Sequence, residues 1–361
     1  MSHVFYRTYR PKTFREIQGQ HFAVRVLTEA INRNTISHAY LFAGPRGTGK
    51  TTLARILAKA LNCAHLKKGD PCGTCEICLA IERGTFVDVI EMDAASHRGI
   101  DDIRAIKEAV EFQPMQSAHK VYIIDEAHML TKDACNALLK VLEEPPEYVV
   151  FILATTEPEK MIPTVLSRVQ RFDFTRLSFS EVHDKLNYIV QQEGLKIPTE
   201  VIDHICYVAE GGLRDAETML NQIAHTDFAT YDIHTIFNRP HTARIIAFLR
   251  AIAAHNQSAA LSFLTECERA STEPLRVLKD TLSLARKTLL LKLNEPSRAT
   301  LVSEMSEDDV ALLSSCAAEF STPHLTTLIR NLMDARKYLY YSPIPFLPLE
   351  LAVIQSTEHT S

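Results

Sequence analysis

The segment Gly44-Pro45-Arg46-Gly47-Thr48-Gly49-Lys50-Thr51 decides the fold of this 361-residue chain. It matches the phosphate-loop pattern G-x-x-x-x-G-K-[ST] at every fixed position. The apolar run 40–43 precedes the segment and the helix-period stretch 51–61 follows it, which is the strand, loop and helix setting that the pattern requires. In this setting the segment predicts a nucleoside triphosphate site and not a chance glycine turn before a helix.

The residues of this loop have separate roles toward a bound nucleotide. Its glycines allow backbone N–H groups to point at phosphate oxygens, and the N-terminus of the following helix adds positive potential. Lys50 is expected to reach the β- and γ-phosphates, and the Thr51 hydroxyl is expected to ligate Mg²⁺.

A second motif ends a later apolar run. Val121-Tyr122-Ile123-Ile124 leads into Asp125-Glu126. We expect Asp125 to hold Mg²⁺ and Glu126 to polarise the attacking water as a general base. Alone, such a run is more often the edge of a strand. Downstream of a complete phosphate loop it predicts an NTPase.

Apolar runs and helix-period stretches alternate up to about residue 177, which predicts an α/β layered domain with a parallel sheet. The runs expected to form strands are residues 39–43, 87–92, 120–125, 149–156 and 169–174. Helix-period stretches lie between them, at residues 23–31, 53–61 and 134–142.

From Ser178 onward the pattern is helical only. The expected helices are residues 180–193, 198–210, 213–225, 243–254, 257–270, 273–293, 306–318 and 323–340. Residues 342–348 are not expected to be regular helix, because their three prolines lack an N–H. With a boundary at Asn238-Arg239-Pro240, the predicted domains are residues 1–177, 178–240 and 241–361.

Composition excludes several classes of protein. With 46% hydrophobic and 23% charged residues, the chain is neither disordered nor collagen-like. The net charge of -5 does not exclude nucleic acid, because a local basic strip can lie on an acidic protein. No apolar run approaches the ~20 residues of a membrane helix, and no signal-peptide core is present. We therefore expect a cytoplasmic protein without membrane association.

Asp125-Glu126-Ala127-His128 spells the box of one helicase superfamily. Such helicases need a second RecA-like domain with an arginine-rich motif. The residues after Ser178 show neither strand runs nor that motif, so the sequence argues against a helicase.

Further polar residues lie where they can serve a nucleotide. Thr155-Thr156 end an apolar run, where Thr156 can sense the γ-phosphate. In Leu166-Ser167-Arg168 the arginine can project off the subunit, and in Gly212-Leu213-Arg214 it can fold back over the nucleotide. Residues 10–14 (RPKTF) and 17–20 (IQGQ) can cover the adenine. A single arginine of this kind is usually a solvated surface charge. All of these motifs together, in this order along the chain, indicate a nucleotide site.

Four cysteines lie within sixteen residues: Cys63, Cys72, Cys75 and Cys78. Four thiolates at this spacing fit a tetrahedral structural Zn²⁺ with no position left for water. Two alternatives stay open: His65 replaces one thiolate, or a Cys-x-x-Cys pair is a redox dithiol. The other four cysteines lie singly on apolar helix faces, as buried small hydrophobes do.

The motifs RPKTF, HAYLFAGPRGTGKTT, DEAHML, NALLKVLEEPPE, ATTEP, LSR and GGLRDA, in this order, resemble those of bacterial DNA polymerase III gamma/tau subunits, the clamp-loader ATPases of the AAA+ class. The resemblance covers residues 4 to about 225, and the helical remainder fits that family's collar. It implies an AAA+ P-loop domain with a zinc module inserted at about residues 62–80, a helical lid and an all-α collar.

The resemblance also implies the function. An ATPase of this family, as part of DNA polymerase III (a DNA-directed DNA polymerase), uses ATP to load the sliding clamp onto primed DNA. Its implied partners are the other loader subunits, joined through the collar into a pentameric hetero-oligomer, together with the clamp and primer-template DNA. Arg168 would act on a neighbouring subunit's ATP and Arg214 on its own, while Arg98 would contact DNA phosphate. The alternative is an ATP-gated scaffold with little hydrolysis of its own.

Two features depart from the family pattern. Val169 follows Arg168, where the family usually has cysteine. The sequence given ends at Ser361, after the collar, so we expect the short form of the family, without the tail that binds the replicative helicase and the polymerase. Because the zinc module is an insertion, ATP binding is expected to survive its loss.

Overall fold

The computed structural model describes residues 4–224, 242–293, 301, 305 and 307–358. The chain divides into two compact units, and each is described by itself. The first consists of residues up to 193 together with 209–222, and the second consists of residues 194–208 and those from 223 onward.

The first unit is built on a five-stranded sheet. Its strands are β1 (Ala39–Ala43), β2 (Val89–Asp93), β3 (Lys120–Asp125), β4 (Val149–Thr155) and β5 (Gln170–Asp173). All neighbours are parallel, in the order β2-β3-β4-β1-β5. The five predicted strands and their parallel arrangement are thus confirmed. Because the strands are parallel, the ends of β1, β3 and β4 lie at one edge of the sheet, where the phosphate loop begins.

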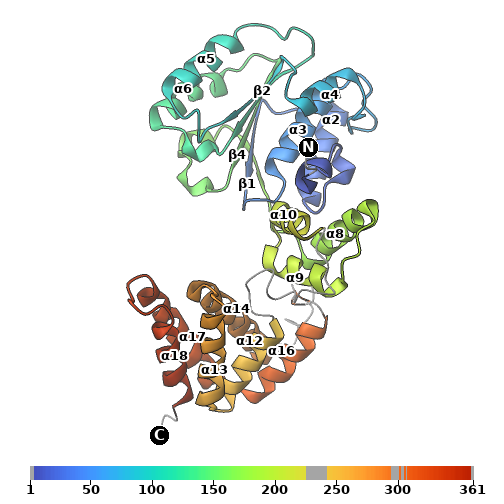
Figure 1. Cartoon of the computed structure of the whole chain (residues 1–361). Coiled ribbons are helices and arrows are strands. Elements are labelled where there is room, and N and C mark those ends of the chain that lie inside the picture. Colours follow the sequence, from blue (N-terminus) through green and yellow to red (C-terminus); the bar gives the residue numbers. More distant parts are fainter. Residues whose placement is uncertain (1–3, 225–241, 294–300, 302–304, 306, 359–361) are drawn as a thin grey trace. The chain divides into compact units, whose positions relative to one another are not determined.

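Helices cover both faces of this sheet, which explains why its strands are apolar almost throughout. Tyr40 and Phe42 of β1 pack with α2 (His21–Arg33) and α3 (Lys50–Asn62). Leu41 points to the other face, toward α5 (Ile100–Val110) and α6 (Lys132–Glu143). Figure 1 shows the two helical layers on either side of the strands.

Shorter elements complete the first unit. They are α1 (Phe5–Thr8), a 3-10 turn at Phe14–Glu16, α4 (Glu76–Arg83), 3-10 turns at Ala127–Met129 and Pro158–Lys160, α7 (Pro163–Leu166), α8 (Phe179–Glu193) and α10 (Leu213–Ile223). The sequence predicted α8 and α10 but not α4 or α5.

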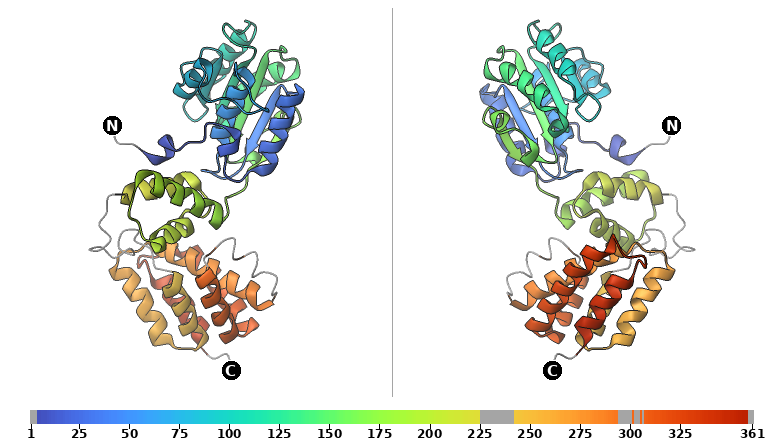
Figure 2. Two further views of the ribbon diagram at one scale, coloured as in Figure 1. Left: turned by 90° about the vertical axis from the view of Figure 1, so that its right-hand side faces the viewer. Right: turned by 90° about the vertical axis from the view of Figure 1, so that its left-hand side faces the viewer.

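In the second unit, the described residues outside the turns are helical. The helices are α9 (Thr199–Ala209), α12 (Thr242–Ala253), α13 (Gln257–Arg269), α14 (Pro274–Leu293), α16 (Glu307–Glu319), α17 (Thr322–Leu339) and α18 (Leu347–Thr357). Helix α17 packs against α14 and α18, and α12 packs against α13 and α16, as Figures 1 and 2 show. Their shared core contains fully buried leucines such as Leu249, Leu284 and Leu332.

One sequence-based expectation is wrong. Regular helix was excluded for residues 342–348, but α18 begins at Leu347. Pro348 lies in the first turn of α18, where a backbone N–H has no partner within the helix, so its ring is tolerated.

The fold class predicted from the sequence is confirmed: a P-loop domain with a parallel sheet and a cysteine cluster, followed by a helical C-terminal region. The boundary at Asn238-Arg239-Pro240 lies outside the described residues, and the division into three domains stays a prediction. Among the described helices, none has both the length and the apolar character needed to cross a membrane.

Candidate nucleotide and metal sites

The phosphate loop leaves β1 through a turn that only glycine fits. Gly44 has φ +147°, and a Cβ at this position would lie 2.3 Å from the Phe174 carbonyl oxygen. The Gly44 N–H donates to the Thr155 carbonyl at 3.1 Å, which ties the loop to β4. Gly49, at φ +98°, then starts α3. The glycines thus turn the backbone from strand to helix.

Lys50 lies over this loop. Its Nζ donates to the carbonyl oxygens of Gly44 at 2.7 Å and Pro45 at 2.8 Å, and the residue is only 6% exposed. Burial lowers the pKa of Lys50, against the opposing effect of Glu126 and Asp125. A cation held away from water attracts phosphate oxygens more strongly, because the local dielectric is low.

The two predicted Mg²⁺ ligands contact each other. Thr51 Oγ1, at the start of α3, donates to Asp125 Oδ2, at the end of β3, at 2.7 Å. Hydroxyl and carboxylate oxygens are hard ligands of the kind that Mg²⁺ prefers. The structure therefore brings both oxygens to one point beside Lys50.

Glu126 has a strained backbone, with φ +49° in the left-handed region that residues other than glycine rarely adopt. Its N–H donates to Asp125 Oδ1 at 3.0 Å, and its Oε2 accepts from Thr156 Oγ1 at 3.1 Å. The predicted general base and the predicted γ-phosphate sensor are therefore in contact. Strain of this kind is typical of functional sites.

His128 is a member of this group that the sequence analysis did not assign. Its Nδ1 lies 2.9 Å from Thr155 Oγ1, and its Nε2 lies 3.3 Å from Glu157 Oε1. The imidazole thus joins the turn after β3 to the end of β4. Its position next to Asp125-Glu126 was the available signal.

Lys50, Thr51, Asp125 and Glu126 line a cleft of about 700 Å³, a size typical of sites for small molecules. Thr156 and His128 do not line it but contact Glu126 and Thr155 behind it. Eight cationic residues contribute to its lining against five acidic ones, an excess that suits a polyphosphate. The cationic residues are Arg7, Arg10, Lys12, Arg46, Lys50, Arg55, Lys59 and Arg214; the acidic residues are Glu82, Glu91, Asp125, Glu126 and Glu217. Pro11, Ile17 and Gln18 of the predicted adenine cover also line it.

Arg214 lies at the phosphate loop of its own chain. A Cβ on Gly47 would be 3.5 Å from the Gly212 Cα and 3.7 Å from the Arg214 Cβ. The Arg214 guanidinium lies over the Tyr6 ring, 4.9 Å from its centre. The start of α10 therefore lies against the loop, as a role in cis requires.

Arg168 lies elsewhere and does not line the cleft. Its Nη2 is 2.6 Å from Glu143 Oε1, its Nη1 donates to the Thr164 carbonyl at 2.8 Å, and its side chain is 33% exposed. It borders a separate shallow depression with Ser37 and His38. Arg98 is exposed and also lies outside the cleft lining.

Two further residues lie near the cleft: Gln20, the last residue of the motif at 17–20, and Glu217, which belongs to no motif. Gln20 Nε2 donates to the Thr175 carbonyl at 2.7 Å and its Oε1 accepts from the Thr175 N–H, which joins the predicted adenine cover to the segment after β5. Glu217 is 5% exposed, and its Oε1 has no hydrogen-bond partner among the described residues. Burial raises the pKa of Glu217 to about 7. Its only signal was its place three residues after Arg214 on one helix face.

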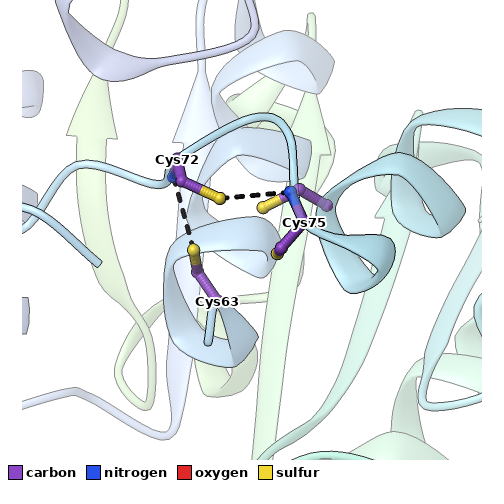
Figure 3. Close-up of side chains that lie close together, drawn as sticks. Cys63, Cys72 and Cys75 are labelled. Carbon is purple, nitrogen blue, oxygen red and sulfur yellow. Dashed lines mark hydrogen bonds between the residues drawn. The ribbon is translucent and has the colours of Figure 1, made fainter. Parts of the chain in front are cut away.

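The four predicted zinc ligands gather at one point. The Sγ atoms of Cys63, Cys72, Cys75 and Cys78 all lie within 4.8 Å of one another. Figure 3 shows the backbone N–H of Cys72 donating to Cys63 Sγ, and that of Cys75 donating to Cys72 Sγ, each at 3.3 Å. Four soft sulfur donors so arranged fit Zn²⁺, and His65 is exposed and outside the group.

The backbone favours the charged form of one of these thiols. Burial alone raises the pKa of Cys72, but the N–H groups of Thr74 and Cys75 donate to its sulfur and, together with the side chains of Thr74 and Cys63, bring the pKa to about 6. A thiolate is the form that binds metal. The remaining cysteines, Cys135, Cys206, Cys267 and Cys316, are buried as predicted.

Comparison with known proteins identifies the relatives of this chain. The sequence-family model described as the delta subunit of DNA polymerase III matches residues 19–178. The family model for domain III of DNA polymerase III subunits gamma and tau matches residues 235–361. DNA polymerase III subunit tau of Bacillus subtilis is 37% identical over 361 residues. The chain belongs to the DNA polymerase III gamma/tau family.

The gamma/tau relatives are longer than this chain. The Bacillus subtilis alignment covers 99% of this chain and 64% of the relative. Subunit tau of Escherichia coli is 33% identical over 356 residues, which cover 98% of this chain and 55% of that protein. Among solved structures, the clamp loader delta protein of Bacillus subtilis aligns over 93% of this chain and 99% of its own, with 15% identity and a TM-score of 0.41, a likeness too weak to carry an argument.

Proposed function

We propose that this gamma/tau chain is the ATPase subunit of a replicative clamp loader, which uses ATP binding and hydrolysis to place a sliding clamp on primed DNA. The observation that carries the proposal is the contact of Thr51 with Asp125 at 2.7 Å, beside Lys50 and Glu126. It supplies a metal position, a phosphate cation and a general base in one cleft. Family membership links this site to DNA polymerase III.

In this proposal each residue of the cleft has one task. The backbone of residues 44–49 and the Lys50 ammonium bind the phosphates of ATP, while Thr51 and Asp125 hold Mg²⁺, which neutralises charge on the β- and γ-phosphates. Glu126 orients and deprotonates the attacking water, and Thr156 places Glu126 and senses the γ-phosphate.

The two arginines act on different nucleotides. Arg214 contacts the ATP of its own chain, in keeping with its place at the phosphate loop. Arg168 lies outside that cleft and stabilises the transition state in a neighbouring subunit. ATP hydrolysis is the chemistry proposed for this chain, and DNA synthesis belongs to another subunit.

Zn²⁺ is proposed at the four cysteines, in a structural role. Four protein sulfurs complete a tetrahedral site, so no position remains for a reacting water. The proposed partners are the other loader subunits, which meet through the helical collar in a pentamer, the sliding clamp and primer-template DNA. Arg98 is proposed as a phosphate contact, and the cytoplasm as the place of action.

The alternative is a scaffold that binds ATP but hydrolyses little of it. Lys50, Asp125, Glu126 and Arg168 are all present, which favours hydrolysis. A scaffold would need neither the general base, Glu126, nor an arginine finger, the role proposed here for Arg168 in a neighbouring site.

Steady-state hydrolysis by the assembled loader tests the proposal. With partner subunits, clamp and primed DNA, we expect ATP turnover to rise roughly tenfold or more over the chain alone, because Arg168 needs a neighbour to act on. Omission of the clamp or use of unprimed duplex is the control. Turnover that stays at background in the complete mixture, with ATP still bound, would favour the scaffold instead.

A further inference from the structure

The segment at residues 10–17, here called the covering segment, forms one wall of the nucleotide cleft. Arg10, Pro11, Lys12 and Ile17 all line that cleft, and Arg10 Nε donates to Thr52 Oγ1 on α3 at 3.1 Å. The segment has a single 3-10 turn and no strand partner. The side chain of Phe14 anchors it in the core at 2% exposure, and its backbone is held by side chains from elsewhere in the unit.

Residues 63–83, from Cys63 to the end of α4, are here called the cysteine module, and Asp70 in it supplies one such anchor. Its Oδ1 accepts from the backbone N–H of Phe14 at 2.7 Å, and its Oδ2 lies 3.3 Å from Arg15 Nε. Asp70 is only 7% exposed. A hydrogen bond from a backbone N–H to a buried carboxylate is strong, and its loss leaves the buried N–H without an acceptor, which costs free energy.

The cysteine module fixes Asp70 in turn. Asp70 exchanges two backbone hydrogen bonds with Lys67, at 2.9 and 3.0 Å, and lies two residues before Cys72. The neighbouring Gly69 sits so close to α2 that a Cβ would lie 2.7 Å from the Thr28 carbonyl oxygen. Asp70 therefore lies in the loop between Cys63 and Cys72, whose two ends a bound metal would hold together.

Two more contacts join the module to the cleft. Glu82 of α4, the helix that carries Cys78, pairs with Lys12 at 3.0 Å and with Lys59 at 3.3 Å, and both lysines line the cleft. A Cβ on Gly73, between Cys72 and Cys75, would be 3.9 Å from Thr13 Cγ2. The module thus contacts the covering segment through Asp70 and Glu82, and lies close to it at Gly73.

We propose that the cysteine module positions the covering segment through Asp70, so that zinc binding and nucleotide binding are coupled. Asp70 is a positioning residue: it touches the segment and not the nucleotide. The inference rests on the proposed function, because it takes the cleft to be the ATP site. It also reverses the expectation that ATP binding survives loss of the module.

The coupling acts on the base end of the nucleotide. Inorganic tripolyphosphate contacts the phosphate loop but lacks the base and ribose that the covering segment would meet. In the full chain, Asp70→Ala is expected to weaken equilibrium binding of ATP about tenfold, because the competent position of the segment becomes a minor state. Tripolyphosphate meets the segment only through the cationic side chains of Arg10 and Lys12, so its affinity is expected to fall less than that of ATP, by no more than about twofold.

Two further variants serve as controls for the loss of ATP affinity in Asp70→Ala. Asp70→Asn keeps an oxygen that accepts from the Phe14 N–H, so we expect ATP affinity within about threefold of the unaltered chain. Asp101→Ala removes an exposed carboxylate of the same unit, which pairs with Arg104 at 3.0 Å on the same helix and with no other described residue, and it should change neither ligand's affinity. Zinc content and circular dichroism are measured for every variant.

Removal of the metal is the second arm. A chelator that strips zinc from the unaltered chain should weaken ATP about as much as Asp70→Ala does, and stripping the Asp70→Ala chain should weaken ATP no further. By reciprocity, ATP should raise the equilibrium affinity of the unaltered chain for zinc, measured by competition with the chelator, but not that of Asp70→Ala.

The outcomes separate the two claims. If the unaltered chain binds no ATP, the proposed function fails. If it binds ATP, and neither Asp70→Ala nor zinc removal changes the affinity, the inference is overturned while the function stands. Equal losses for ATP and tripolyphosphate also overturn it, because Asp70 would then support the unit as a whole and not the covering segment.

Discussion

Lys50 shows how burial turns an ordinary lysine into a phosphate ligand. Among the described residues it forms no ion pair, although Asp125 and Glu126 lie near enough to act on its charge; its hydrogen bonds go to the two carbonyls of its own loop. The fold therefore does not depend on its charge. Its desolvated ammonium is available to bind the polyphosphate, which is the role of the lysine in the phosphate-loop motif.

Replacing Lys50 by alanine should abolish hydrolysis, by at least about a hundredfold, and leave the fold intact, because the charge serves phosphate and not the core. The measurements are ATP turnover in the assembled loader and circular dichroism. Lys107→Ala, an exposed lysine on α5, is the matched control. Normal turnover in a well-folded Lys50→Ala chain would end the assignment.

Glu217 makes stability depend on pH. Its pKa is raised from 4.5 to about 7 by burial, against the charges of Lys185 and Arg10. Between these two values the unfolded chain has lost a proton that the folded chain keeps, so the free energy of unfolding falls as pH rises through this window.

Glu217→Gln removes this titration. The variant should match the unaltered chain near pH 4.5 and exceed it above pH 7, with a gain in the free energy of unfolding of roughly 2–3 kcal/mol. Urea unfolding at pH 5 and pH 8 measures it, with the exposed Glu108→Gln as control. A difference that is the same at both pH values would contradict the argument.

At the scale of elements, the strands that carry the site could be predicted because they are buried on both faces. β1 and β3 have the predicted bounds, and β4 ends one residue earlier than predicted. By contrast, α5 has only three buried residues among its charges and α18 starts behind prolines, so neither gave a clear periodic signal. The cysteine spacing predicted the cluster itself, because short loops bring nearby thiols together.

The cysteine cluster should hold close to one Zn²⁺ per chain. Replacing Cys72 and Cys75 together by serine should release it, because two of four sulfur ligands are lost. Elemental analysis in reducing buffer measures the metal. Cys135→Ala, a buried cysteine outside the cluster, should keep it. A chain that contains no zinc when freshly purified under reducing conditions would reject the site.

At the scale of the whole molecule, contacts between distant segments were beyond prediction. Asp70 accepts a hydrogen bond from the backbone N–H of Phe14, which is 56 positions away in the sequence, and no local sequence pattern predicts this pairing. Gln20 and Thr175 meet across 155 residues in the same way. Motifs name the residues that touch a ligand, whereas the residues that position them depend on the tertiary fold.

The two arginines should differ when each is changed to alanine. Arg168→Ala should lower turnover by ~10³-fold or more with little change in ATP affinity, because a finger stabilises charge that develops only in the transition state. Arg214→Ala should weaken ATP binding as well, because Arg214 lies at the phosphate loop. Equilibrium binding and turnover, measured on both, check this split. Equal loss of affinity in both variants would contradict it.

Mixing two inactive variants tests whether this chain is an ATPase whose site is completed by a neighbouring subunit. Lys50→Ala chains keep Arg168, and Arg168→Ala chains keep the phosphate loop. In a mixed assembly, a Lys50→Ala subunit can place its arginine at the ATP of an Arg168→Ala subunit, so partial turnover should return. If the mixed assembly forms and stays as inactive as either parent, Arg168 does not act in trans and the account is wrong.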